Sequence, residues 1–230
     1  MAKAQKRKFV SPAGEAVYPY LNRPDTADID GQPQRPAFKC RLRIDSDNKA
    51  GTIQNGKPTA ETLRQLIDRL VDEAWDERED SIPAKYKKVA EKVYPYEEEV
   101  DGAGEPTGTL LFNFKQNAEL ALKDGSVAKV KIDLFDAKRK RTTSNIGGGS
   151  KLKIAFTHRT YGMVSGKQYN VGISLDFSGV QILELVEFGG GSADSYGFGD
   201  EDYDGIDSAP SDSGDMSHHD HDEEGEEDDF

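Results

Sequence analysis

Strict alternation of apolar and polar side chains is the feature that most restricts the fold of this chain. A period of two places one set of side chains on each face of a β-strand. The clearest case has a basic polar set: Phe38, Cys40, Leu42 and Ile44 alternate with Lys39, Arg41, Arg43 and Asp45. Further strands are predicted at 110–114, 129–134, 151–156, 168–177 and 179–188. Six strands with glycine-rich turns between several of them favour a barrel or a sandwich.

One helix is predicted to interrupt the strands, at about residues 59–79. Pro58 and Thr59 provide a start signal, and the apolar residues that follow recur with a period of 3.6. They form one stripe: Leu63, Leu66, Ile67, Leu70, Val71, Ala74 and Trp75. We expect this stripe to face the core, so that the helix caps the sheet. A weaker helical pattern covers 84–93.

Charge divides the chain into two parts. All 30 Lys and Arg residues lie in the first 191 residues, whereas the last 39 residues, Ser192 to Phe230, contain sixteen Asp or Glu and no basic residue. The net charge of −13 therefore combines about +3 for the body with −16 for the tail. The tail is too polar to offset the entropy of ordering. We predict one folded domain at 1–191 and a disordered acidic tail at 192–230.

The sequence contains few residues that could form a catalytic, cofactor-binding or metal-binding site. The body holds a single histidine, His158, and a single cysteine, Cys40, without recognisable catalytic spacing. The glycine-rich run at 146–151 lacks the Gly-Lys-Ser/Thr order of a phosphate loop. One cysteine fits a reducing compartment, and neither a leader nor a membrane span is recognisable. We expect a soluble, cytoplasmic, non-enzymatic protein without cofactor or metal.

Basic side chains line the polar faces of three predicted strands: Lys39, Arg41 and Arg43; Lys129 and Lys131; Lys151 and Lys153. Alternate residues stand about 7 Å apart, near the spacing of phosphates in an extended strand. A solvated outer face is the alternative explanation for any single pair. Three such sets beside a polyanionic tail favour a nucleic-acid groove with a built-in competitor.

Single-stranded nucleic acid also needs aromatic platforms on which bases stack. Tyr161 is the strongest candidate, because it lies between Arg159 and Gly162 in a predicted hairpin turn. Other aromatic residues off the apolar faces are Phe9, Tyr18, Tyr20, Tyr94 and Tyr96. Packing in the fold is the alternative role for each of them.

Three segments carry a resemblance to a known family. They are Ile146-Gly-Gly-Gly-Ser-Lys-Leu-Lys-Ile154, the later Leu183-Glu-Leu-Val-Glu-Phe-Gly-Gly-Gly191, and an acidic tail that ends Asp-Asp-Phe. Together with Pro33-Gln34-Arg35 before Phe38-Lys39, they resemble the single-stranded DNA-binding protein of the T-seven-like phages. In this chain Pro36 stands where the family has Gly.

The resemblance implies an OB-fold-like antiparallel barrel of five to six strands with a capping helix. It implies binding, protection and annealing of single-stranded DNA in phage replication and recombination, in the cytoplasm of the infected host. DNA contacts carry over to Arg35 and Tyr161. The acidic tail would recruit the phage DNA polymerase and primase-helicase, with Glu227, Asp228, Asp229 and Phe230 as its contact residues. A homodimer is compatible with this reading.

These inferences combine into a gating mechanism. Without DNA, the tail would lie transiently over the basic groove, and DNA would displace it and free it for partners. Two other functional classes remain as alternatives. An acidic chaperone would bind basic proteins through the tail, and a cold-shock type module would bind single-stranded RNA.

Overall fold

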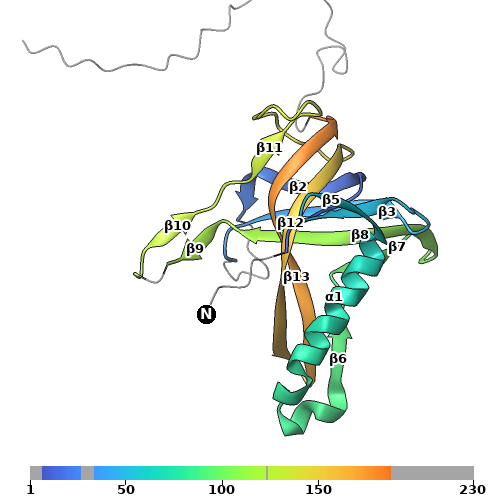
Figure 1. The fold of residues 1–230 in the computed structure, drawn as a ribbon, viewed down its shortest axis with the longest axis vertical. Coiled ribbons are helices and arrows are strands. Elements are labelled where there is room, and N and C mark those ends of the chain that lie inside the picture. The colour runs from blue at the N-terminus through green and yellow to red at the C-terminus, as the bar shows by residue number, and fades with distance from the viewer. Residues whose placement is uncertain (1–6, 27–33, 123, 188–230) are drawn as a thin grey trace, which may run out of the picture. The chain divides into compact units, whose positions relative to one another are not determined.

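The computed structural model describes residues 7–26, 34–122 and 124–187 (Figure 1). The chain divides into two units, Met1–Gly190 and Gly191–Phe230, and the second lies outside the described residues. The predicted boundary at 191/192 and the predicted state of the tail therefore stay predictions. Within the described residues, no helix is long and apolar enough to cross a membrane.

Among the described residues, eleven strands form one mixed sheet. They are β1 (Phe9–Val10), β2 (Gly14–Asp25), β3 (Ala37–Asp45), β4 (Gly51–Gln54), β5 (Lys57–Thr62), β6 (Ala90–Val93), β7 (Tyr96–Val100), β8 (Pro106–Asn117), β11 (Asp133–Phe135), β12 (Lys151–Ser165) and β13 (Gln168–Glu184). Two more strands, β9 (Glu119–Ala121) and β10 (Val127–Lys129), pair only with each other and form an arm beside the sheet (Figure 1).

The pairings of five strands return to their starting point. β12 pairs with both β13 and β2, β2 pairs with β3, β3 pairs with β8, and β8 pairs with β13. Most of these pairs are antiparallel, but β13 runs parallel to β6, β8 and β11. Four of these strands, β3, β8, β12 and β13, carry hydrophobic alternations that were read from the sequence, whereas β2 was not predicted.

A mainly β architecture with one α-helix is confirmed for the described residues, but the predicted strand number and purely antiparallel pairing were wrong. The segments that form β4, β5, β6 and β7 are short and polar, so they carry no apolar alternation. They pair at the margins of the sheet, where Ala90 of β6 and Tyr96 of β7 pack against the core. The predicted strand at 129–134 is also broken, because β10 belongs to the arm while β11 pairs with β13.

Helix α1 (Leu63–Arg78) begins later than predicted, because residues 57–62 form strand β5. Thr62 caps the helix: its hydroxyl accepts a hydrogen bond from Gln65 N at 3.3 Å, and its own N donates to Gln65 Oε1 at 3.0 Å. The stripe from Leu63 to Ala74 is buried, as predicted, and Trp75 packs at its edge. Residues 84–93 form the short 3₁₀ helix η2 (Ala84–Val89) followed by β6, after another 3₁₀ turn, η1 (Glu79–Ser81).

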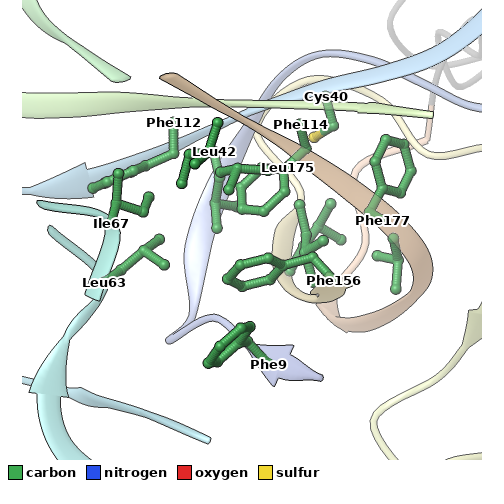
Figure 2. Close-up of a cluster of buried hydrophobic side chains, with 14 of the residues drawn as sticks. Phe9, Cys40, Leu42, Leu63, Ile67, Phe112, Phe114, Phe156, Leu175 and Phe177 are labelled. Atoms are coloured by element: carbon green, nitrogen blue, oxygen red, sulfur yellow. The ribbon is translucent and has the colours of Figure 1, made fainter. Parts of the chain in front are cut away.

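Aromatic rings from distant parts of the chain meet in the core (Figure 2). The rings of Phe9 and Phe114 lie 5.5 and 5.3 Å from the ring of Phe156. Leu63 and Ile67 of α1 reach the same cluster from the helix side (Figure 2). Phe9 is therefore a core residue and not a platform for a base. Burial of this cluster fixes β3 and β8 with their polar side chains directed outward.

Candidate nucleic-acid interface

The polar side chains of β3 point away from the core, as the alternation predicted, but each of its three basic residues has a carboxylate partner. Lys39 Nζ lies 2.7 Å from Asp25 Oδ2, and Arg41 Nη1 lies 3.0 Å from Glu97 Oε1. Both ion pairs are partly open to solvent. Such pairs contribute little stability, so a phosphate can compete for the cation.

Arg43 is held more firmly than Lys39 or Arg41. Its Nε and Nη2 donate to the two carboxylate oxygens of Glu99 at 2.8 and 2.5 Å, and its Nη1 donates to Glu15 at 2.8 Å. The hydrogen bond from Arg43, followed by one from Thr109, lowers the pKa of Glu99. Glu97 and Glu99 both belong to β7, so this acidic strand neutralises one end of the basic face.

The other end of this face contains a hollow of about 430 Å³, here called the tyrosine hollow. The register of the sheet builds it: Tyr20 of β2 lies opposite Lys39 of β3, which lies opposite Lys115 of β8. One step along, Arg41 lies opposite Asn113. The lining residues are Tyr18, Tyr20, Asp25, Lys39, Cys40, Arg41, Asn113, Phe114 and Lys115. The hollow thus combines aromatic rings with cationic side chains.

Two tyrosines stand at the rim of the tyrosine hollow. Tyr18 is 77% exposed and Tyr20 is 40% exposed. Tyr18 has a φ of +48°, and the pairing of β2 with β3 shifts register between Val17 and Tyr20. Irregularities of this kind redirect side chains and concentrate at binding sites. The local backbone therefore presents both rings to solvent.

A second hollow of about 790 Å³ adjoins the same two tyrosines and is here called the glycine hollow. Its walls come from β2, from Arg43 and from the segment before β12. The lining residues are Glu15, Ala16, Val17, Tyr18, Pro19, Tyr20, Leu21, Asn22, Arg23, Arg43, Asn145, Ile146, Gly148 and Gly149. Because both hollows share Tyr18 and Tyr20, they form one continuous surface around these rings.

Comparison with known families matches residues 13–185 to the family described as the single-stranded DNA-binding protein of bacteriophage T7. The chain belongs to this family. The single-stranded DNA-binding protein of Enterobacteria phage T3 is 27% identical over 206 residues, which cover 85% of this chain and 84% of that protein. The corresponding protein of Escherichia phage T7 is 28% identical over 199 residues, 82% of this chain and 81% of that protein.

A solved structure shares the fold. The crystal structure of gp2.5, a single-stranded DNA-binding protein encoded by bacteriophage T7, is 24% identical in sequence and superposes with a TM-score of 0.59. The match covers 88% of this chain and 99% of gp2.5. The family that was recognised from the glycine-rich motifs and the acidic tail is shown by the match over residues 13–185.

The structure distributes the other basic residues predicted to bind DNA over several elements. Lys151 of β12 pairs with Glu184 at 3.4 Å and lies opposite Glu15, so it joins the row that contains Arg43. Lys153 is half-buried opposite Gln181. The other three basic residues are exposed: Arg35 before β3, Lys129 on the arm, and Lys131 between β10 and β11. The three predicted basic sets therefore do not form a single row.

Tyr161 does not lie in a hairpin turn, contrary to the sequence prediction. It lies within β12 opposite Gly172, and the turn comes later, at Gly166 and Lys167. A side chain added at Gly172 would place its Cβ 2.9 Å from the Tyr161 hydroxyl, so the ring lies over β13. The neighbouring Gly162 was mistaken for a turn residue, but it instead makes room for the ring of Tyr169. Burial raises the pKa of Tyr161.

Sequence reasoning missed the residues that complete the tyrosine hollow. Lys115 and Asn113 occupy the polar positions of the alternation in β8, so the signal was present. Tyr18 and Tyr20 were named as candidates, but nothing in the sequence placed them beside Lys39. The predicted partner-binding residues Glu227, Asp228, Asp229 and Phe230 lie outside the described residues.

Proposed function

We propose that this protein binds single-stranded DNA during phage DNA replication, and coats, protects and anneals the strand without catalysing a reaction. The observation that carries the proposal is the tyrosine hollow, where two exposed tyrosines stand beside Lys39, Arg41 and Lys115. Rings that stack on bases and cations that neutralise phosphates are the two requirements for binding single strands. Membership of the phage family supports the same function.

We interpret the five strands with cyclic pairing as an OB-type barrel. Their order is β2, β3, β8, β13 and β12, with β8 parallel to β13 and β2 antiparallel to β12. Barrels of this type bind oligonucleotides on the face of their second and third strands and with two adjoining loops. Here those strands are β3 and β8, which contribute Lys39, Arg41, Asn113 and Lys115 to the hollow. The first of the loops precedes β3 and carries Arg35.

The remaining predicted contacts stay part of the proposal. Arg35, Lys129, Lys131, Lys151 and Lys153 would guide or extend the strand around the central hollow. Arg43 would contribute only after a phosphate displaces Glu99 or Glu15. Tyr161, on the hairpin of β12 and β13, would contact DNA at the second of the two loops.

The acidic tail is proposed to gate this site and to recruit replication proteins. A charge of −16 opposes the approach of phosphates to the body, most strongly at low ionic strength. When DNA displaces it, the tail with Glu227, Asp228, Asp229 and Phe230 would bind the phage DNA polymerase and primase-helicase. These steps would take place in the cytoplasm of the infected host, with the protein as monomer or homodimer.

A fluorescence anisotropy titration with a labelled single-stranded oligonucleotide tests the function. Each neutralised phosphate contributes about −0.7 to the slope of log affinity against log salt, so we expect a slope of about −2 to −5. An RNA oligonucleotide of the same sequence serves as competitor and should bind more weakly. A flat salt response, or preference for RNA, would contradict the proposal.

A further inference from the structure

Four consecutive basic residues, Lys138-Arg139-Lys140-Arg141, form an exposed turn that the binding site described above does not use. The turn follows β11 (Figure 1) and is here called the basic turn. We propose that it is a second phosphate-binding site, which holds the same DNA strand after the strand has crossed the glycine hollow. This inference rests on the proposed function and extends its site.

The backbone of the basic turn is fixed by several hydrogen bonds. Asp136 N donates to Lys140 O at 2.9 Å, Arg139 N donates to Asp136 O at 3.0 Å, and Lys140 N donates to Asp136 Oδ1 at 2.8 Å. From β13, Gln181 Nε2 donates to Ala137 O at 3.2 Å. Arg139 has a φ of +64°, which this network maintains. A turn that is already ordered loses less entropy when it binds a ligand.

Only one of the four cations of the basic turn forms an ion pair within the described residues. Arg141 pairs with Asp133 at 2.9 Å, and its guanidinium lies 5.6 Å from the centre of the Phe135 ring. Within the described residues, no ion pair involves Lys138, Arg139 or Lys140. The three basic residues of β3, by contrast, all have carboxylate partners. The turn therefore offers three cations that an incoming phosphate need not first free from a carboxylate.

The segment that follows the basic turn leads to the glycine hollow. Asn22 of β2 donates to Ser144 O at 2.8 Å and accepts from Ile146 N at 3.1 Å, which holds the segment after the turn against β2. Asn145, which lies between Ser144 and Ile146, lines the glycine hollow. Asn145 comes four positions after Arg141, a span of at most about 14 Å. A DNA strand that runs from Tyr18 through the glycine hollow would therefore reach the basic turn.

The test compares two triple variants of the full-length chain. Lys138→Gln/Arg139→Gln/Lys140→Gln removes the three cations of the turn. The control variant, Lys85→Gln/Lys87→Gln/Lys88→Gln, makes the same change of charge on η2. This segment follows the C-terminal end of α1 and lies at the end of the body away from β11 (Figure 1). Each variant is titrated with oligonucleotides of about 5 and about 20 nucleotides, because one barrel of this type covers about 4 to 16.

We expect the turn variant to bind the long oligonucleotide about five- to thirtyfold more weakly than the control variant does. Its salt slope should be smaller by about 1 to 2, since each lost phosphate contact removes about 0.7. The short oligonucleotide should bind both variants equally within about twofold, because it fills the tyrosine hollow without reaching the turn.

Three outcomes would overturn the inference: equal binding of the long oligonucleotide, an equal loss for both lengths, or tighter binding by the turn variant. The last result would identify the turn as a site for the protein's own acidic tail. Failure of the proposed function would be distinct from all three, because the unchanged protein would then bind neither oligonucleotide.

Discussion

At the scale of single residues, Tyr18 has the most exposed large apolar side chain in the described part of the chain and borders both hollows. A base stacked on such a ring gains about 1 to 3 kcal/mol. We therefore expect Tyr18→Ala to weaken binding of single-stranded DNA by that amount. The salt slope should stay the same, because a stacked base releases no counterion.

The matched control is Tyr94→Ala, which removes another exposed ring that packs on Tyr96 and borders neither hollow. Titrations at several salt concentrations distinguish the two variants. If both bind equally well, the bases do not stack at Tyr18. Tyr161→Ala tests the contact expected from the family in the same assay, and it too should weaken binding at constant slope.

Removal of a charge at the tyrosine hollow should lower the salt slope, unlike removal of a tyrosine ring. Lys115 lies opposite Lys39, and in Lys115→Gln the side chain keeps most of its length but loses its charge. We expect weaker binding together with a salt slope that is smaller by about 0.7, the value for one phosphate contact. Arg35→Ala should reduce the slope in the same way. An unchanged slope in Lys115→Gln would place the phosphates elsewhere.

At the scale of elements, β7 determines how much of the basic face is open to DNA. Glu97 forms an ion pair with Arg41, whereas the neighbouring Glu98 forms no ion pair within the described residues. Glu97→Gln should therefore tighten binding by about 0.2 to 1 kcal/mol, the usual strength of an exposed ion pair. Glu98→Gln makes the same change of charge and should have a smaller effect. Equal effects would mean that the carboxylate of Glu97 acts only through net charge.

Helix α1 packs against the sheet without lining either hollow. Thr62→Ala removes the side-chain cap of α1 and should lower the free energy of unfolding by about 0.5 to 2 kcal/mol. Affinity for DNA at a temperature well below the unfolding transition should not change. Chemical denaturation measures the first effect and the anisotropy titration the second. A loss of affinity in folded Thr62→Ala protein would give the helix a role in binding.

The sequence predicted the elements with strong periodicity and missed those without it. The apolar residues of β3 and β8, such as Leu42 and Phe112, follow a period of two because one face of each strand is buried. Strand β7 has the sequence Tyr-Glu-Glu-Glu-Val, and nothing in its pattern reveals that Glu97 will meet Arg41. Partners of this kind depend on how distant strands align, which a single sequence does not encode locally. The candidate site was therefore predicted only in part.

At the scale of the whole molecule, two oppositely charged parts share one chain. Deletion of Ser192 to Phe230 removes a charge of −16 and should tighten binding of single-stranded DNA, most clearly at low salt. The buried core of the body is built from residues between Phe9 and Ile182, so we expect the body to remain folded. Deletion of Phe230 alone keeps all the side-chain carboxylates, and should weaken partner binding while leaving affinity for DNA nearly unchanged. Weaker DNA binding after tail deletion would contradict gating.

Photochemical cross-linking tests directly whether DNA lies in the tyrosine hollow. A single-stranded oligonucleotide that carries 5-iodouracil is irradiated in complex with the full-length protein, and the attached peptides are identified by mass spectrometry. We expect cross-links at Tyr18 or Tyr20, and their loss in Tyr18→Ala/Tyr20→Ala protein. Cross-links found only on α1 or η2, with none on β2, β3 or β8, would contradict it.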